Sequence, residues 1–424
     1  MARKPETIFV QIASYRDPQL IPTIKDMLDK CKNPDNLRIG IAWQHSSEDE
    51  WDNLDEYKDD DRFRILNIPY EDSEGACWAR NLLQQLYDGE TYTLQIDSHT
   101  RFIENWDYEL KKELKRLIKN GIKKPLLTSY APSFEPDNDP ESRIMKPWRM
   151  DFDRFSPDGN VHFLPSTIDD FEERSEPIPA RFYSAHFAFT LGEFAEKVQH
   201  DPKYYFHGEE ISIAVRAYTH GYDLLHPHKI FLWHYYTRKG LKKHWDDHNT
   251  WGTNNDNSHV RNRKLLGVDG EIYDPEEFGP WGLGDERTID EYERYSGIKF
   301  SRRAVLQHTA DKLDPPCPVF ESDEEYENAF TTPFKHCIDI HFDSVPHDDY
   351  NVWAVAFEDE DGNELFRQDA DENEIKRMKQ DPDKFCRVWR SFNTVKRPYK
   401  WIVWPHSIKE GWVNRLEGTL YEKK

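Results

Sequence analysis

The sequence from Thr91 to His99 reads Thr-Tyr-Thr-Leu-Gln-Ile-Asp-Ser-His, an apolar run that ends in an acid and an imidazole. The first six residues have the composition of a buried strand. In parallel α/β sheets, ligands bind beyond the carboxyl ends of the strands. This stretch therefore predicts that Asp97 and His99 lie together at the mouth of a pocket.

The chain before this stretch alternates between strand and helix patterns. Apolar, β-favouring runs occur at residues 8–15, 37–43 and 62–68, and helical spacing of apolar residues follows Asp17 and Gly75. The order is therefore strand, helix, strand, loop, strand, helix, strand. This alternation predicts an α/β domain with a parallel sheet covered by helices.

Downstream of His99 the patterns are more widely spaced. An amphipathic helix is expected at 104–119, followed by a strand at 124–130. Residues 131–180 are rich in Pro, Asp and Ser without a clear period, so we expect long loops that form a lid or an acceptor-binding surface. The remaining expected elements are strands at 181–190 and 229–234, and helices after 207 and near 288–295.

The pattern changes after Pro315-Pro316-Cys317-Pro318, which has the composition of a linker. Beyond it, apolar residues alternate with polar ones, as in Ile338, Ile340 and Phe342, and the turn Asp361-Gly362-Asn363 follows a second such run. We therefore expect two domains: an α/β domain at residues 1–314 and a small, mainly-β accessory domain at residues 319–424.

The overall composition narrows the possible partners and location. The formal net charge is -23, which argues against a nucleic acid partner because such binding depends on Lys and Arg. The five cysteines are odd in number and contain no CxxC pair, which indicates reduced thiols rather than a disulfide framework. No stretch approaches the roughly 20 apolar residues of a membrane span, and no secretion signal is present. We expect a cytoplasmic protein.

The tripeptide Asp-x-His occurs three times, at Asp97, Asp246 and Asp339. The second lies in a polar stretch and the third on the polar face of an amphipathic strand. Only Asp97 ends a buried strand where the fold class places its ligand. A carboxylate and an imidazole in this position suit Mn²⁺, or Mg²⁺, better than Ca²⁺. The alternative is an Asp helix cap beside a structural histidine.

Further candidate residues lie at the ends of later elements. His234 also ends an apolar strand and is the candidate third metal ligand, although a histidine in this position can be purely structural. Glu209 and Glu210 open a helix, where acidic residues can also serve only to complement the helix dipole.

Together these motifs resemble a known family. Asp-x-His after a strand, Gly-Glu-Glu at a helix start and a strand-terminal His occur in this order in polypeptide N-acetylgalactosaminyltransferases. The resemblance is closer to the GlcNAc-transferase family of GT-A glycosyltransferases that includes cytoplasmic prolyl-hydroxyl N-acetylglucosaminyltransferases, and it covers roughly residues 6 to 300. The segments that carry it are Ile12–Asp17, Gly75–Arg80, Gln95–His99, His207–Ser212 and Gly282–Thr288.

The resemblance implies a GT-A type nucleotide-sugar-binding sheet and a role for each candidate residue. Asp97, His99 and His234 would hold Mn²⁺ against the diphosphate of a UDP-sugar. Asp97 would also be a catalytic residue. Glu209 or Glu210 would accept hydrogen bonds from donor-sugar hydroxyls. The uridine and donor site would comprise Ala13, Ser14, Tyr15, Arg16, Asp17, Arg80, Ser98 and His186, the last of which replaces a small residue of the family. Transfer would retain the anomeric configuration.

The sequence leaves three functions open. The first is a metal-dependent glycosyltransferase that moves GlcNAc or a related hexose to a hydroxyl of a protein or glycan. The second is a carbohydrate-binding or adaptor protein on an inactive transferase core. The third is a metal-dependent hydrolase, which the same ligands could serve.

Overall fold

The computed structural model describes residues 5–238 and 240–420. The chain forms two compact units. The first comprises the described residues up to Ser301 together with Asp311–Pro318, and the second comprises Arg302–Ala310 and the residues from Val319 onward. No helix among the described residues has the length and apolar character needed to cross a membrane.

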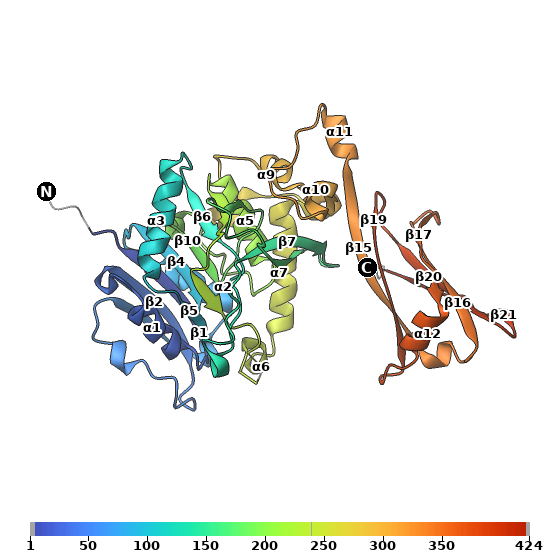
Figure 1. The fold of residues 1–424 in the computed structure, drawn as a ribbon, viewed down its shortest axis with the longest axis horizontal. Helices are drawn as coiled ribbons and strands as arrows, with labels where there is room; N and C mark the ends of the chain where they lie inside the picture. Colours follow the sequence, from blue (N-terminus) through green and yellow to red (C-terminus); the bar gives the residue numbers. More distant parts are fainter. Residues whose placement is uncertain (1–4, 239, 421–424) are drawn as a thin grey trace. The chain divides into compact units, whose positions relative to one another are not determined.

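The first unit is built around an eight-stranded sheet with strand order β3-β2-β1-β4-β10-β6-β11-β9 (Figure 1). Neighbouring strands from β3 to β4 are parallel, whereas β10 runs antiparallel to both β4 and β6. The strands are β1 (Ile8–Tyr15), β2 (Leu37–His45), β3 (Phe63–Pro69), β4 (Tyr92–Asp97), β6 (Pro125–Thr128), β9 (Ile178–Pro179), β10 (Phe187–Leu191) and β11 (Asp223–His226). The α/β class is confirmed, but the sheet is mixed because the chain enters β10 from the opposite end after its long excursion.

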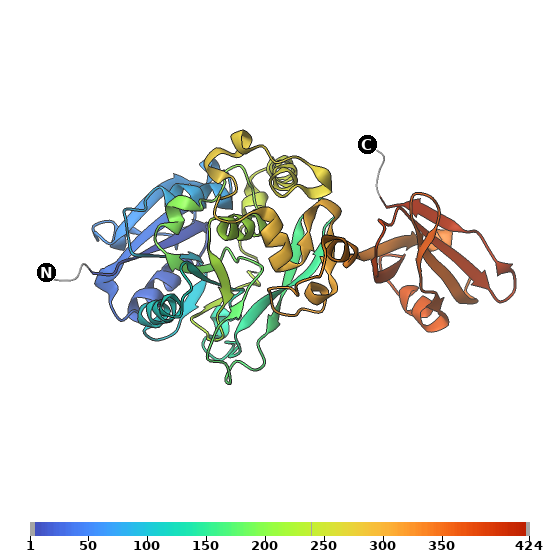
Figure 2. The same cartoon turned by 90° about the horizontal axis from the view of Figure 1, so that it is seen from above.

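Helices cover both faces of this sheet (Figures 1 and 2). Alternate residues of β1, such as Ile8, Val10 and Ile12, pack on one face with α1 (Leu20–Asp29) and α3 (Trp106–Lys119). On the other face, Ala79 and Leu83 of α2 (Ala76–Gln84) pack with Ala42. Successive side chains of β1 point to opposite faces of the sheet, and both faces are covered, so most of the strand is apolar and buried. The core therefore fixes the positions of the strand ends.

The prediction of long loops at residues 131–180 is wrong in part. This segment contains the hairpin β7 (Trp148–Phe155) and β8 (Val161–Thr167), as well as β9. The expected strand at 229–234 is shorter, β12 (Leu232–His234), and pairs antiparallel with β5 (Thr100–Phe102) in a separate small sheet. The helices of this unit that have not yet been given are α4 (Phe194–Lys197), α5 (Glu209–Thr219), α6 (His244–Asp247), α7 (Trp251–Leu266), α8 (Pro275–Phe278) and α9 (Ile289–Ser296). Helix α7 was not predicted, because its polar and aromatic sequence lacks a strong apolar stripe.

The second unit is mainly β, as predicted. In one sheet, β15 (Phe330–His341) pairs antiparallel with β14 (Ala304–Leu306) and β19 (Phe385–Thr394), and in the other, β16 (Tyr350–Glu358) pairs with β20 (Lys400–Ser407). The core includes Ile338, Trp353, Val355 and Val388. The smaller elements are β17 (Glu364–Arg367), β18 (Ala370–Asp371), β21 (Gly411–Trp412), β22 (Leu416–Thr419), α10 (Gln307–Ala310), α11 (Asp323–Asn328) and α12 (Glu372–Met378).

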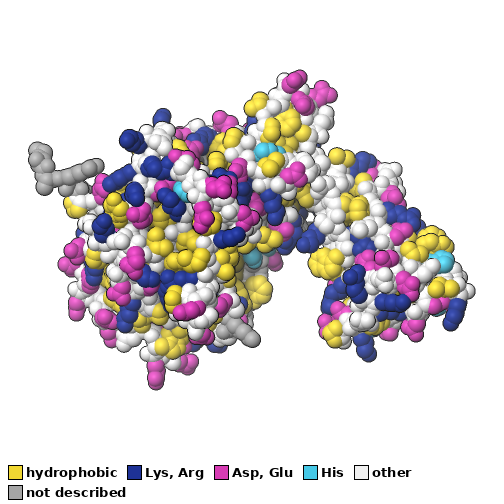
Figure 3. Space-filling view, viewed as in Figure 1, with side chains coloured by type: hydrophobic (Ala, Val, Ile, Leu, Met, Phe, Trp, Pro, Cys, Tyr) yellow, Lys and Arg dark blue, Asp and Glu magenta, His cyan; other side chains and the backbone are white. Residues whose placement is uncertain are grey.

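Charged side chains of both signs are interspersed on one face of the molecule (Figure 3). On the face drawn in Figure 3, Lys and Arg alternate with Asp and Glu over the part of the surface that the structure describes, instead of forming a continuous basic stripe. This distribution offers no obvious track for a phosphate backbone.

Candidate functional site

Three candidate ligands meet where β4 and β12 end. Asp97 is the last residue of β4, and His234 is the last residue of β12. Asp97 Oδ2 lies 3.3 Å from His234 Nε2 and 3.7 Å from His99 Nε2. We call these three residues the Asp97 cluster. The structure thus brings together one carboxylate and two imidazoles that are up to 137 residues apart in the chain.

Asp17 determines which nitrogen of His99 carries a proton. His99 Nδ1 lies 2.6 Å from Asp17 Oδ2. Burial raises the pKa of Asp17, but the facing His99 and Arg238 outweigh this effect and hold it below the usual value, so the carboxylate is ionised and can only accept. His99 Nδ1 must therefore donate, and in the neutral ring the lone pair on Nε2 faces Asp97. A cation bound between His99 Nε2 and Asp97 Oδ2 would interact favourably with both atoms.

His234 offers a second neutral nitrogen to the same cation. Burial lowers the pKa of His234 to about 4. Its Nδ1 atom is buried and has no hydrogen-bond partner among the described residues. The donor set of one carboxylate and two imidazoles, with His99 oriented by a carboxylate behind it, fits a divalent ion such as Mn²⁺.

Arg80 connects the Asp97 cluster to the start of α5. Its Nη2 donates to Asp97 Oδ1 at 2.9 Å, and its Nη1 donates to Glu209 Oε1 at 2.7 Å. Burial raises the pKa of Asp97, but the hydrogen bond from His234 and the charge of Arg80 hold it well below the usual value. The guanidinium therefore neutralises two acidic groups that would otherwise be buried without a counter-charge.

The neighbouring Glu209 and Glu210 lie in opposite electrostatic environments. Glu209 is buried, yet Arg80 lowers its pKa to about 2. Burial raises the pKa of Glu210 to about 7. Glu210 accepts hydrogen bonds from the Ala185 backbone N–H and the Tyr130 hydroxyl, both at 2.9 Å. One carboxylate is therefore permanently charged, and the other can change its charge near neutral pH.

Glycines open both helices that deliver these residues. Gly75 precedes α2 with φ 113°, and Gly208 precedes α5 with φ 92°. A Cβ atom on Gly208 would come within 3.0 Å of Asn160 Oδ1, and one on Gly75 would come equally close to the ring of Tyr205. Both motifs therefore need glycine for the backbone conformation and for the space.

The Asp97 cluster lies in the wall of a cavity of about 530 Å³. Of the predicted donor-binding residues, Ala13, Tyr15, Arg80, Ser98 and His186 line this cavity, as do Glu209 and Glu210. Ser14, Arg16 and Asp17 are not among its lining residues. Instead, Arg16 forms ion pairs with Asp49 and Asp247, and Asp17 lies behind His99.

His186 is held against the metal-ligand candidates. Its ring stacks on His234 with centroids 4.1 Å apart, and its Nε2 accepts a hydrogen bond from the Ala131 backbone N–H at 3.1 Å. Burial holds the pKa of His186 well below its usual value. The ring is therefore neutral and occupies volume that a small residue would leave to a ligand.

Several residues of the site were not predicted from the sequence. Tyr130 and Tyr236 flank Glu210 and His186, and Arg238 lies 3.5 Å from Asp17. Cys77 and His200 both contact Glu209. Cys77 lies within a motif that the sequence singled out, but nothing in the sequence indicates that α2 and the loop before α5 meet.

The sequence matches one protein family over most of its length. The family model described as glycosyltransferase (GlcNAc) matches residues 7–61 and 53–302. This match confirms the family predicted from the motifs. Among curated proteins, no match is found.

Solved glycosyltransferase structures resemble the chain at low sequence identity. A structure of GalNAc-T7 with UDP, GalNAc and Mn²⁺ is 15% identical, with a TM-score of 0.43, and the match covers 68% of this chain and 54% of that one, so the chain spans about half of its length. S. aureus TarS 1-349 in complex with UDP-GlcNAc is 11% identical (TM-score 0.35; 65% and 78% covered). The mannosyltransferase PcManGT from Pyrobaculum calidifontis, with GDP-Man and Mn²⁺, is 10% identical (TM-score 0.35; 57% and 59% covered).

Proposed function

Since this chain belongs to the glycosyltransferase (GlcNAc) family, we propose that it transfers GlcNAc or a related hexose from a UDP-sugar to a hydroxyl group, and that the transfer depends on Mn²⁺ or Mg²⁺. The observation that carries the metal requirement is the geometry of the Asp97 cluster. His99 Nε2 and His234 Nε2 both face one carboxylate oxygen, Asp97 Oδ2, at the wall of the cavity.

Asp97, His99 and His234 would hold the ion. When bound, it would neutralise the charge that develops on the departing diphosphate. The protein contributes the orientation of the ligands: Asp17 fixes the His99 ring, and Arg80 fixes the Asp97 carboxylate. Because the guanidinium lies at this end of the cavity, it also adds positive charge where a diphosphate would bind.

The cavity has room for a nucleotide-sugar donor. Ala13 and Tyr15 lie at the end of β1 and would contact the uridine, while Ser98 and His186 would lie near the sugar and phosphates. Ser14, Arg16 and Asp17 would support this wall from behind. The His186 ring would limit the size of the donor sugar that fits beside His234.

Glu210 would accept a hydrogen bond from a donor-sugar hydroxyl, since it lines the cavity and is only partly buried. Glu209 is less available because Arg80, Cys77 and His200 already surround its carboxylate. Its proposed catalytic contribution is to position Arg80. We further propose retention of the anomeric configuration and a protein or glycan acceptor.

The function is tested by incubating the protein with a panel of UDP-sugars, each with Mn²⁺, Mg²⁺ or chelator, and with a cell extract as the source of acceptors. Mass spectrometry of the extract should show a hexose or N-acetylhexosamine added to protein or glycan, and UDP release should require the metal. If no UDP-sugar is consumed with any metal, the proposal is wrong. Release of free sugar without an acceptor product would instead indicate the hydrolase.

An inactive core that only binds carbohydrate predicts a different result. Glycan binding would then survive both chelation and Asp97→Ala, with no turnover. The complete carboxylate and imidazole set argues against this alternative, because an inactive core has no need to retain it.

A further inference from the structure

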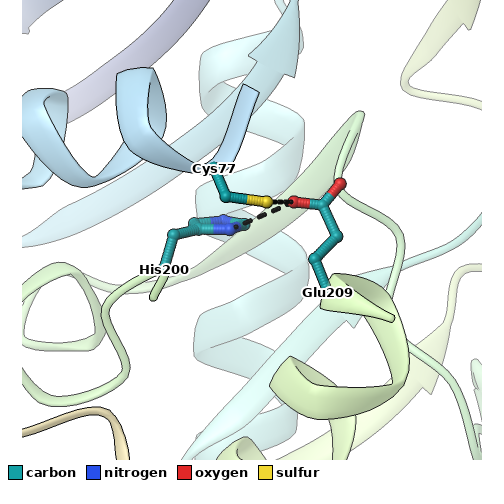
Figure 4. A group of neighbouring side chains, drawn as sticks. All are labelled: Cys77, His200 and Glu209. Atoms are coloured by element: carbon teal, nitrogen blue, oxygen red, sulfur yellow. Dashed lines mark hydrogen bonds and ion pairs between the residues drawn. The ribbon is translucent and has the colours of Figure 1, made fainter. Parts of the chain in front are cut away.

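A second group of candidate ligands extends behind the cavity wall from Glu209, which lines the cavity and binds Arg80. Cys77 is the second residue of α2, Glu209 is the first residue of α5, and His200 lies in the loop between α4 and α5 (Figure 4). Cys77 Sγ lies 2.8 Å from Glu209 Oε2, and His200 Nδ1 lies 3.4 Å from the same oxygen. We call these three residues the Cys77 cluster. Their ligand atoms all lie within 4.8 Å of one another.

The hydrogen bonds around Gln95 determine the protonation of His200. Gln95 Nε2 donates to the Ala185 carbonyl at 2.7 Å, so Gln95 Oε1 is the atom that faces His200 Nε2 at 2.8 Å. An amide oxygen only accepts, which means that His200 Nε2 carries a proton. Burial lowers the pKa of His200, so Nδ1 is left with a lone pair.

This lone pair points at an acceptor. His200 is 1% exposed, and its Nδ1 atom has no hydrogen-bond partner among the described residues. This atom lies 3.4 Å from Glu209 Oε2, and this carboxylate forms an ion pair with Arg80 and has no proton to donate. The Cys77 thiol has a single proton and directs it at Glu209. The ring therefore lacks a partner that a cation would supply.

We propose that Cys77, His200 and Glu209 bind a structural Zn²⁺ ion. Zinc takes cysteine sulfur, imidazole nitrogen and carboxylate oxygen as ligands, and a thiolate selects zinc over Mn²⁺. The outer N–H of His200 donates to Gln95, as the second nitrogen of a ligating histidine ordinarily does.

Binding would replace one proton by the metal. The Cys77 S–H bond breaks, the sulfur bonds to Zn²⁺, and the proton leaves to solvent, so thiolate and carboxylate together balance the two positive charges. Glu209 Oε1 would remain on Arg80, 2.7 Å from Nη1. The ion would thus join the starts of α2 and α5 and hold the arginine that orients Asp97.

The direct test uses the full-length protein and a readout that does not depend on transfer. Protein produced in zinc-depleted, cobalt-supplemented medium should show the near-ultraviolet thiolate-to-cobalt absorption and the strong visible bands of a tetrahedral site. Protein purified without added cobalt should keep about one zinc per chain, by elemental analysis, after chelator has removed the ion from the Asp97 cluster. The absence of both signals in the wild-type protein would overturn the proposal, with the cluster then holding only a proton.

Two variants identify the sulfur and separate the two clusters. Cys77→Ser should lose the retained zinc and the thiolate band. Cys386→Ser removes an equally buried thiol in the second unit, and it should keep both. Asp97→Asn should also keep both, because it alters only the cluster at the cavity. Retention of zinc and of the thiolate band by Cys77→Ser would overturn the assignment, and failure of the transferase proposal would leave all of these readouts unchanged.

Discussion

The Asp97 cluster and the Cys77 cluster share one arrangement but differ in access. In each, the outer N–H of a histidine donates to an oxygen, and its inner nitrogen faces a carboxylate oxygen. The Asp97 side chain is 22% exposed and lines the cavity, whereas Cys77 and His200 are buried and do not line it.

This difference separates a site for chemistry from a site for structure. A metal that must contact a substrate needs an open coordination position, and a structural metal is enclosed by the protein. Oxygen and nitrogen ligands at the cavity suit Mn²⁺, and the sulfur behind it suits zinc. Arg80 joins the two clusters through Glu209 and Asp97.

The largest expected effect comes from the ligand that faces the cavity. Asp97→Asn should reduce transfer on the order of 10³-fold, because it removes the charged ligand of the ion that stabilises the leaving diphosphate. UDP release from the UDP-sugar, measured with saturating Mn²⁺, gives the rate.

The matched control is Asp339→Asn, which alters the same Asp-x-His tripeptide at an exposed position of β15 in the second unit. It should leave the rate unchanged. Equal losses in the two variants would show that the position at the end of β4 has no special role.

Removing the connection between the clusters should lower stability in addition to any loss of transfer. Arg80→Ala leaves Asp97 and Glu209 buried without their cation, and breaking such a pair costs about 3–5 kcal/mol. Urea unfolding gives the free energy of unfolding of the first unit.

The comparison variant is Arg116→Ala on α3, whose pairs with Glu113 and Glu176 lie nearer the surface. Exposed pairs contribute about 0–1 kcal/mol. If Arg80→Ala lowered the free energy of unfolding as little as Arg116→Ala does, Arg80 would not be needed to hold the two clusters together.

The residue behind the open cluster should tune metal affinity. Asp17→Asn weakens the bond that orients His99, and loss of such a partner typically lowers metal affinity about 10–100-fold. The Mn²⁺ concentration at half-maximal activity should rise by this factor, with a smaller change in the rate at saturating metal. An unchanged metal requirement would contradict the role given to Asp17. The zinc content should not change.

The smallest expected effect is the pH dependence conferred by Glu210. Its pKa is raised by burial to about 7, so the proposed hydrogen-bond acceptor is ionised above this pH and protonated below it. The value of kcat/KM should therefore rise with pH to a plateau above about 7 and fall about tenfold per pH unit below it. In Glu210→Gln this inflection should vanish. Persistence of the inflection in the variant would assign it to another group.

Much of the first unit could be predicted because its signals are local. The strands β1, β2 and β4 are apolar runs with clear ends, and the α3 pattern is strongly amphipathic. The hairpin β7–β8 does not follow from the sequence pattern because most of its strand residues are partly or fully exposed and its segment is rich in turn-forming residues. Antiparallel β10 was not foreseen because strand direction depends on the path of the preceding chain.

The part of the candidate site that could be predicted consists of residues at the ends of strands. Asp97, His99 and His234 follow from position in the fold, and the structure brings them together. Cys77 and His200 could not be predicted as partners because their meeting depends on how α2 packs beside the loop before α5. The sequence also could not show that Asp17 lies behind His99 rather than at the cavity, since that requires the direction of its side chain.

The most direct test of the central claim is the linkage between UDP and metal binding. Thermal unfolding of the full-length protein should be followed while UDP is titrated with Mn²⁺ and with chelator, because a ligand that binds only the folded state raises the unfolding temperature. UDP should stabilise the wild-type protein only when Mn²⁺ is present, and Asp97→Asn should lose this effect while Asp339→Asn keeps it. Equal stabilisation by UDP with and without metal, or none in either condition, would contradict the central claim.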